Sequence, residues 1–107
     1  MKKVIINHFM YDATTGEATL VEQLLCQERE HSYKIIGGKG RQVIWKRHLN
    51  ELNGRTWIQT YSLGDIEQFK RSIIIELKLR IDLCERRITY EEHEIKKYKE
   101  HIERLKQ

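Results

Sequence analysis

The residues best suited to bind a ligand gather in one stretch of the chain, residues 34–55. This stretch holds six basic residues against a single acid, Glu51, a local charge of +5, so the rest of the chain carries −1 of the formal net charge of +4. The basic residues are Lys34, Lys39, Arg41, Lys46, Arg47 and Arg55. Glycine stands at positions 37, 38 and 40, and aromatic rings follow at Trp45, Trp57 and Tyr61. Accessible backbone N–H groups and fixed cations bind phosphate, and aromatic rings stack on bases, so this combination indicates a nucleotide.

Each part of this pattern also has a simpler interpretation. The glycines lack the GxxxxGK[ST] spacing of a Walker A loop and do not open a helix, so they form either a phosphate cradle or a hairpin turn with solvated cations. Trp45 and Trp57 are either stacking platforms or parts of the sheet core or of a dimer interface. Arg41 and Lys46 lie five residues apart, which places them on opposite faces of a regular strand. A bulge, a dimer boundary or a turn after Lys46 must therefore bring them to one ligand.

The sequence does not predict an enzyme. No serine or cysteine lies in the context of a nucleophile elbow, and the histidines lack the spacing of metal ligands. The histidines are His8, His31, His48, His93 and His101. Two cysteines do not make a disulfide scaffold, so we expect Cys26 and Cys84 to be small buried hydrophobic residues in a reducing compartment. We expect no catalytic residue, no metal and no cofactor.

The first sixty or so residues are typical of β-structure. Strands are expected at residues 4–11, 17–26, 32–36, 41–46 and 55–61. The first two strands should form a hairpin, because residues 12–16 make a turn in which Gly16 can adopt a positive φ. Residues 47–52 suit one helical turn, which Asn53 and Gly54 would close.

A single long helix is expected over residues 62–107. Ser62 is a suitable N-cap, with Asp65 three residues on as a variant of the capping box, and the chain contains no proline to break the helix. Isoleucine recurs with a strict seven-residue period along this helix. The position three residues after each isoleucine is also apolar or aromatic, except for Glu91. This seam consists of Ile74, Leu77, Ile81, Cys84, Ile88, Ile95, Tyr98, Ile102 and Leu105.

A seam of this length needs a partner helix, and a second copy of the chain is the nearest candidate. With isoleucine at the a positions of the heptad, a parallel partner helix creates three attractive charge pairs. The pairs are Arg80 with Glu85, Arg87 with Glu92, and Glu94 with Lys99. Exposed pairs of this kind select orientation more than they add stability. The alternative is an amphipathic helix that lies on its own domain.

These patterns predict an α+β chain of one domain, residues 1–107. A small antiparallel β-sheet would occupy residues 1–61 and the long helix residues 62–107. Residues 73–83 carry apolar side chains on more than one face, so one face can pack on the sheet and another on the partner helix. The distal part of the helix is then expected to form a parallel coiled coil in an oligomer that is at least a dimer.

We expect a cytoplasmic protein. Lys2 and Lys3 precede only a short apolar run, which Asn7 and His8 interrupt, and this does not resemble a signal peptide. No stretch has the roughly 18–20 uncharged apolar residues that a membrane span requires, so no membrane partner is expected.

The order of the expected elements offers a further comparison. A first strand, a turn at Thr15 and Gly16 and a second strand precede a strand that contains Tyr33 and Lys34. A basic strand with the pattern Arg41-x-x-Ile44-x-Lys46, a hairpin near Asn53 and Gly54 and a long charged helix follow. This layout resembles the Thoeris anti-defence family of phage signal-sequestering proteins, also called sponges.

The resemblance implies an oligomer without catalytic activity, acting in the cytosol of a host cell. It would trap cyclic ADP-ribose-type signals made by bacterial TIR enzymes, and some members of the family also take up cyclic oligonucleotides. By this resemblance Arg41 and Lys46 would belong to a phosphate-contacting strand. The expected ligand-binding residues are Arg41, Lys46, Lys39, Arg55, Trp57 and Arg71.

Two other functions fit the same sequence. A small nucleic-acid-binding regulator would lay residues 34–55 along a phosphate backbone, although a net charge of only +4 is modest for binding a polymer. An anti-CRISPR-like inhibitor or a coiled-coil adaptor would bind another protein and no small ligand.

Overall fold

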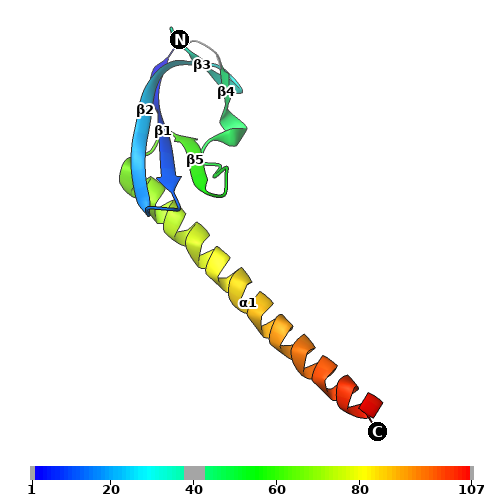
Figure 1. The fold of residues 1–107 in the computed structure, drawn as a ribbon. Helices are drawn as coiled ribbons and strands as arrows, with labels where there is room; N and C mark the ends of the chain where they lie inside the picture. The colour runs from blue at the N-terminus through cyan, green and yellow to red at the C-terminus, as the bar shows by residue number, and fades with distance from the viewer. Residues whose placement is uncertain (1, 38–42, 107) are drawn as a thin grey trace. The chain divides into compact units, whose positions relative to one another are not determined.

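The computed structural model describes residues 2–37 and 43–106, which form the α+β fold that the sequence predicts (Figure 1). Five antiparallel strands precede one long helix. The elements in chain order are β1 (Lys3–Asp12), β2 (Glu17–Glu28), β3 (Ser32–Ile35), β4 (Val43–Trp45), the 3-10 helix η1 (Lys46–His48), β5 (Trp57–Ser62) and α1 (Ile66–Lys106). All five expected strands are present, and their ends differ from the expectation by a few residues.

Several differences from the expected elements lie around β4 and β5. Lys46, expected at the end of β4, instead begins η1, and the helical turn expected over residues 47–52 is this 3-10 helix, which ends at His48. Strand β5 begins at Trp57 rather than at residue 55. Residues 38–42 lie outside the described residues, so the roles expected of Lys39 and Arg41 stay predictions.

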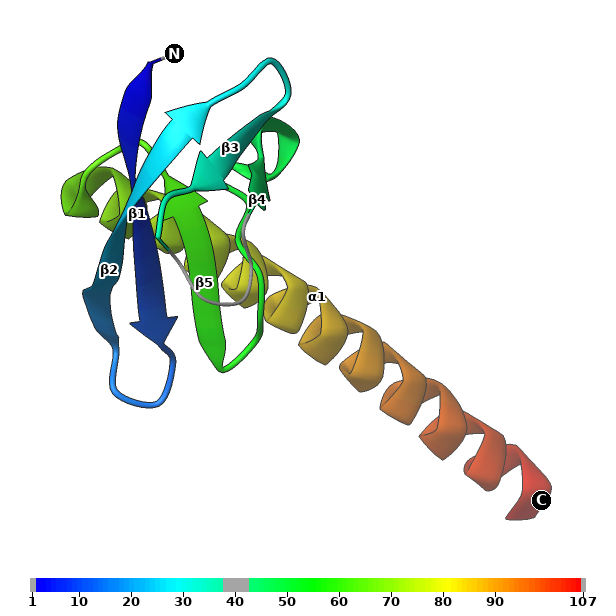
Figure 2. The ribbon, with the colours of Figure 1, turned by 90° about the horizontal axis from the view of Figure 1, so that it is seen from above.

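The sheet has the strand order β4-β3-β2-β1-β5, and it curls until the segment after β4 meets β5 (Figure 2). At this meeting point the backbone N–H of Asn50 donates to the carbonyl of Tyr61 at 2.8 Å. Asn53 and Gln59 exchange backbone hydrogen bonds of 2.9 and 2.8 Å. The curl therefore gives the sheet an enclosed inner face and an outer face.

The inner face holds the first of two hydrophobic clusters. Its buried members are Ile6, Cys26, Tyr33 and Ile44. Leu49, from the segment after η1, and Tyr61, from β5, pack partly buried against them, so side chains from both edges of the curled sheet close over the cluster. Cys26 is buried as expected, and this burial raises the pKa of its thiol above the ordinary value.

The outer face packs on the beginning of α1. Successive residues of a strand point to opposite faces, so Phe9 of β1 faces away from the cluster that contains Ile6. The Phe9 ring stacks on Phe69 of α1 with centroids 5.1 Å apart, and Ile73, one helical turn later, is 3% exposed. The register of β1 with β5 places Thr60 beside Phe9, on this same outer face.

Asp65 is the N-cap of α1. Its Oδ1 accepts a hydrogen bond from the backbone N–H of Gln68 at 2.9 Å, and its carbonyl accepts one from the N–H of Phe69 at 3.2 Å. The expectation that Ser62 caps the helix is wrong, because Ser62 is still the last residue of β5. Its hydroxyl accepts the N–H of Gly64 at 2.9 Å in the turn that separates the strand from the helix.

The chain divides by its internal contacts into two compact units, residues 1–73 and residues 74–107. The described residues of the second unit, 74–106, are the remainder of α1, whose 41 residues make a helix about 60 Å long. The isoleucines of the seam are between 51% and 57% exposed in the single chain. Cys84, which was expected to be buried, is also exposed, and its burial against a partner stays a prediction.

In the part of the chain that the structure describes, no helix combines the length and the apolar character needed to cross a membrane.

Candidate ligand-binding site

The residues predicted to bind a ligand lie in separate places. Trp57 begins β5 and is 57% exposed. Lys46 lies in η1, where its Nζ pairs with Oε1 of Glu28 at 3.1 Å. Arg55 is exposed in the loop before β5, and Arg71 is exposed on α1. Among the described residues, the hollows that Trp57 and Lys46 line have no residue in common.

Trp57 lines the larger part of an open cleft on the inner face of the curled sheet. One hollow of about 420 Å³ is lined by Asn53, Gly54, Trp57, Gln59 and Tyr61. A second hollow of about 250 Å³ is lined by Ile44, His48, Glu51, Asn53 and Tyr61. The two hollows share Asn53 and Tyr61, and we call them together the inner cleft. It combines two aromatic rings, which can stack on a ligand, with amide, imidazole and carboxylate groups, which can form hydrogen bonds to it.

The alternation of β5 supplies one wall of the inner cleft. Ile58, Thr60 and Ser62 are buried, whereas Trp57, Gln59 and Tyr61 alternate with them and point to the inner face. The opposite wall is the segment that follows η1, held to β5 by its backbone bonds. Two residues in this segment have positive φ, Asn50 at 62° and Gly54 at 106°. The segment therefore turns sharply at both ends, which sets Glu51 and Asn53 opposite β5.

A histidine supports the Tyr61 side of the cleft. The His8 ring stacks on the Tyr61 ring with centroids 4.5 Å apart, and its Nε2 lies 2.8 Å from Oε1 of Gln59. Its Nδ1 is 3.4 Å from Oε1 of Glu22, and the His8 side chain is only 12% exposed. His8 thus packs behind one face of Tyr61 and limits the orientations that this ring can adopt.

Trp57 lies beside the turn between β1 and β2. Asp12 pairs with Trp57 in the β1–β5 ladder. Hydrogen bonds from Thr14 and, more weakly, from Trp57 to the Asp12 carboxylate lower the pKa of this carboxyl group below its ordinary value. Trp57 is itself 57% exposed, so a ligand can reach its ring.

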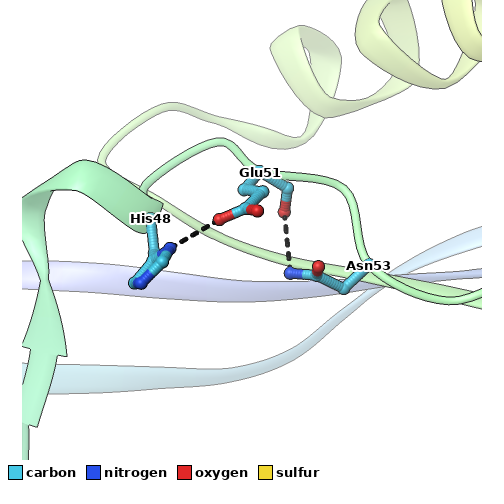
Figure 3. Close-up of polar contacts among 3 residues, drawn as sticks. All are labelled: His48, Glu51 and Asn53. Carbon is cyan, nitrogen blue, oxygen red and sulfur yellow. Dashed lines mark hydrogen bonds and ion pairs between the residues drawn. The ribbon is translucent and has the colours of Figure 1, made fainter.

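The pair formed by His48 and Glu51 is the feature of this cleft that sequence reasoning missed. Nδ1 of His48 lies 2.7 Å from Oε2 of Glu51, and Nδ2 of Asn53 donates to the Glu51 carbonyl at 3.5 Å (Figure 3). An ionised carboxylate can only accept hydrogen bonds, so Nδ1 carries the proton in this contact. The sequence contains one signal that could have predicted this pair, namely the i, i+3 spacing of the two residues within the expected helical turn.

Lys46 belongs to a different hollow on the chain, of about 480 Å³. It is lined by Glu30, His31, Trp45, Lys46 and Arg47. The Arg47 guanidinium lies 5.6 Å from the Trp45 ring centroid, and Trp45 is 45% exposed. With Trp57 also exposed, the interpretation of these tryptophans as sheet core is wrong for both.

Comparison of the chain with protein-family models, with curated proteins and with solved structures finds no match. Within residues 2–37 and 43–106, no group of three or more His, Cys, Asp or Glu side chains could hold a metal ion. Function is therefore inferred from the geometry of the inner cleft.

Gly54→Ala should distort this cleft. A Cβ at residue 54 would collide with the Trp57 carbonyl oxygen, and the φ of 106° is already unfavourable for alanine. We expect a loss of roughly 1–3 kcal/mol in the free energy of unfolding, measured by urea denaturation. Gly16→Ala is the matched control. Gly16 also has a positive φ, of 78°, but a Cβ at this position would contact no other atom within 4 Å. Equal losses for both variants would contradict the close packing of the loop against Trp57.

Proposed function

We propose that this protein binds a small nucleotide of the cyclic ADP-ribose type in the inner cleft and sequesters it, without catalysis, in the cytosol of a host cell. The observation that carries the proposal is the presence of an exposed ring, Trp57, and a partly buried ring, Tyr61, beside fixed hydrogen-bonding groups in one open cleft. The order of the elements, which resembles that of the Thoeris anti-defence proteins, supports the cyclic ADP-ribose class.

The cleft offers a partner for each part of a nucleotide. A base can stack on Trp57 or Tyr61. The side-chain amides of Asn53 and Gln59 can donate and accept at the edge of the base. Arg55, two residues before Trp57, is the basic residue nearest to this wall in the sequence and is the candidate for phosphate. Since the lining residues include no serine or cysteine, binding is favoured over covalent catalysis.

We also propose that the chain forms a parallel dimer or a larger assembly through α1. The helix is continuous through the whole seam, and the seam isoleucines are exposed in the single chain. Two residues of the expected interchain pairs have contacts within their own helix, Arg80 with Glu76 at 3.3 Å and Glu94 with Lys97 at 3.3 Å. Dimerisation would exchange these contacts for contacts across the interface, so most of its free energy would come from burial of the apolar seam.

The hollow at Trp45 favours the second candidate function, binding of single-stranded nucleic acid. An exposed indole beside Lys46 and Arg47 is an arrangement that stacks a base and contacts the backbone. Lys46 is however already paired with Glu28, which reduces the positive charge available there. We therefore place this function second.

Trp57→Ala should weaken binding of cyclic ADP-ribose about ten- to a hundredfold in isothermal titration calorimetry, because one stacking platform is lost. Trp45→Ala, the matched control, should leave this affinity unchanged. Both variants should fold normally, because both tryptophan side chains are exposed.

The same titration separates the two candidate functions. A polymer site should lose affinity steeply as salt rises, through counterion release, whereas a cleft with few phosphate contacts should respond weakly. If affinity fell steeply with salt, and if Trp45→Ala but not Trp57→Ala weakened binding, the result would favour nucleic acid and contradict the nucleotide proposal.

Ile88→Asp should dissociate the dimer, because it would bury an unpaired carboxylate in the seam at a cost of several kcal/mol. Light scattering at micromolar concentration would measure the mass. His93→Asp, on an exposed position of the same helix outside the seam, is the control and should leave the mass unchanged. A wild-type chain that is monomeric at this concentration would refute the coiled coil.

A further inference from the structure

We propose that the His48/Glu51 pair binds the two neighbouring hydroxyl groups of a ribose. This inference rests on the proposed function, since it assigns the sugar of the nucleotide to one end of the inner cleft. It adds a requirement that the aromatic rings alone do not impose, namely a free vicinal diol on the ligand.

The chemistry follows from the hydrogen bond within the pair. Nδ1 of His48 donates to Oε2 of Glu51 at 2.7 Å. The remaining groups are Oε1 of Glu51 and, in the neutral ring, Nε2 of His48, and both are acceptors. Two acceptors on paired side chains that line one hollow match two hydroxyl donors on adjacent carbons. A carboxylate that accepts a ribose hydroxyl is also the means by which dinucleotide-binding folds recognise this sugar.

The pair is held in place and yet accessible. The backbone N–H of Glu51 donates to the His48 carbonyl at 3.3 Å. The backbone N–H of the preceding residue, Asn50, donates to the Tyr61 carbonyl at 2.8 Å. The Asn53 side chain bonds to the Glu51 carbonyl on the other side. The side chains of His48 and Glu51 are nevertheless 44% and 49% exposed, so a ligand can reach them.

The position of the pair also orients the ligand. Tyr61 lines the same hollow as Glu51, so a ribose at the pair brings its base to Tyr61 and toward Trp57. The Glu51 carboxylate repels phosphate, so phosphate groups should point out of this hollow.

The chain offers a contrasting pair, His31 with Glu30 at 3.5 Å, whose side chains are 79% and 87% exposed and lie outside the inner cleft.

Calorimetric titration with adenosine 5′-monophosphate and its 2′-deoxy analogue tests the inference. The wild type should bind the ribonucleotide about ten- to a hundredfold more tightly, because the deoxy analogue leaves a charged acceptor unsatisfied. Glu51→Gln should reduce this preference to less than threefold, and the control Glu30→Gln should keep it. Native melting curves for both variants would show that the fold is intact.

The outcomes separate this inference from the proposed function. Equal affinity of the wild type for both nucleotides would overturn the diol inference and leave nucleotide binding standing. A third probe, ribose 5-phosphate, carries the diol without a base. If it bound as tightly as the nucleotide and lost affinity in Glu51→Gln, the diol inference would hold and the nucleotide proposal would fail. Binding of none of the three would overturn the diol inference, and the titration with cyclic ADP-ribose would then decide the nucleotide proposal.

Discussion

The structure depends on the strict alternation of side chains along β1, which must supply two hydrophobic clusters at once. Ile6 enters the cluster on the inner face, while Phe9 stacks on Phe69 of α1 on the outer face. A sheet this small can bury both faces only if the helix covers one and the curl of the sheet encloses the other. The alternation thereby explains which face of the sheet the first turns of α1 cover and why the segment after β4 meets β5.

The inner cleft is a consequence of that curl. The apolar side chains that close the inner face end at Tyr61 and Ile44, and polar residues occupy the space beyond them. His8 lies at the boundary, two residues after Ile6 on the same face of β1, where it stacks on Tyr61. The enclosed core therefore holds the aromatic wall in place, and the loop opposite it brings Glu51 and Asn53 within reach of the same ligand.

The sequence predicts the fold better than the site, for a physical reason. Strand alternation and the heptad seam are local patterns, so the strands, the hairpin and α1 follow from neighbouring residues. The cleft depends on contacts between residue 8 and residues near 60, which no local pattern specifies. Trp57 was predicted as a ligand residue and lines the cleft, whereas His48 and Glu51 were not predicted. Lys46 was predicted for the same site as Trp57, but its ion pair with Glu28 holds it beside a different hollow.

The central claim, that the inner cleft is the ligand site, is tested most directly by a nitrogen-15 NMR titration with cyclic ADP-ribose. The signals to follow are the indole N–H groups of Trp57 and Trp45 and the side-chain amides of Asn53 and Gln59. If the inner cleft is the ligand site, the signals of Trp57, Asn53 and Gln59 should shift together with one saturation curve, while that of Trp45 should stay in place. Shifts confined to Trp45, or no shift at saturating ligand, would contradict it.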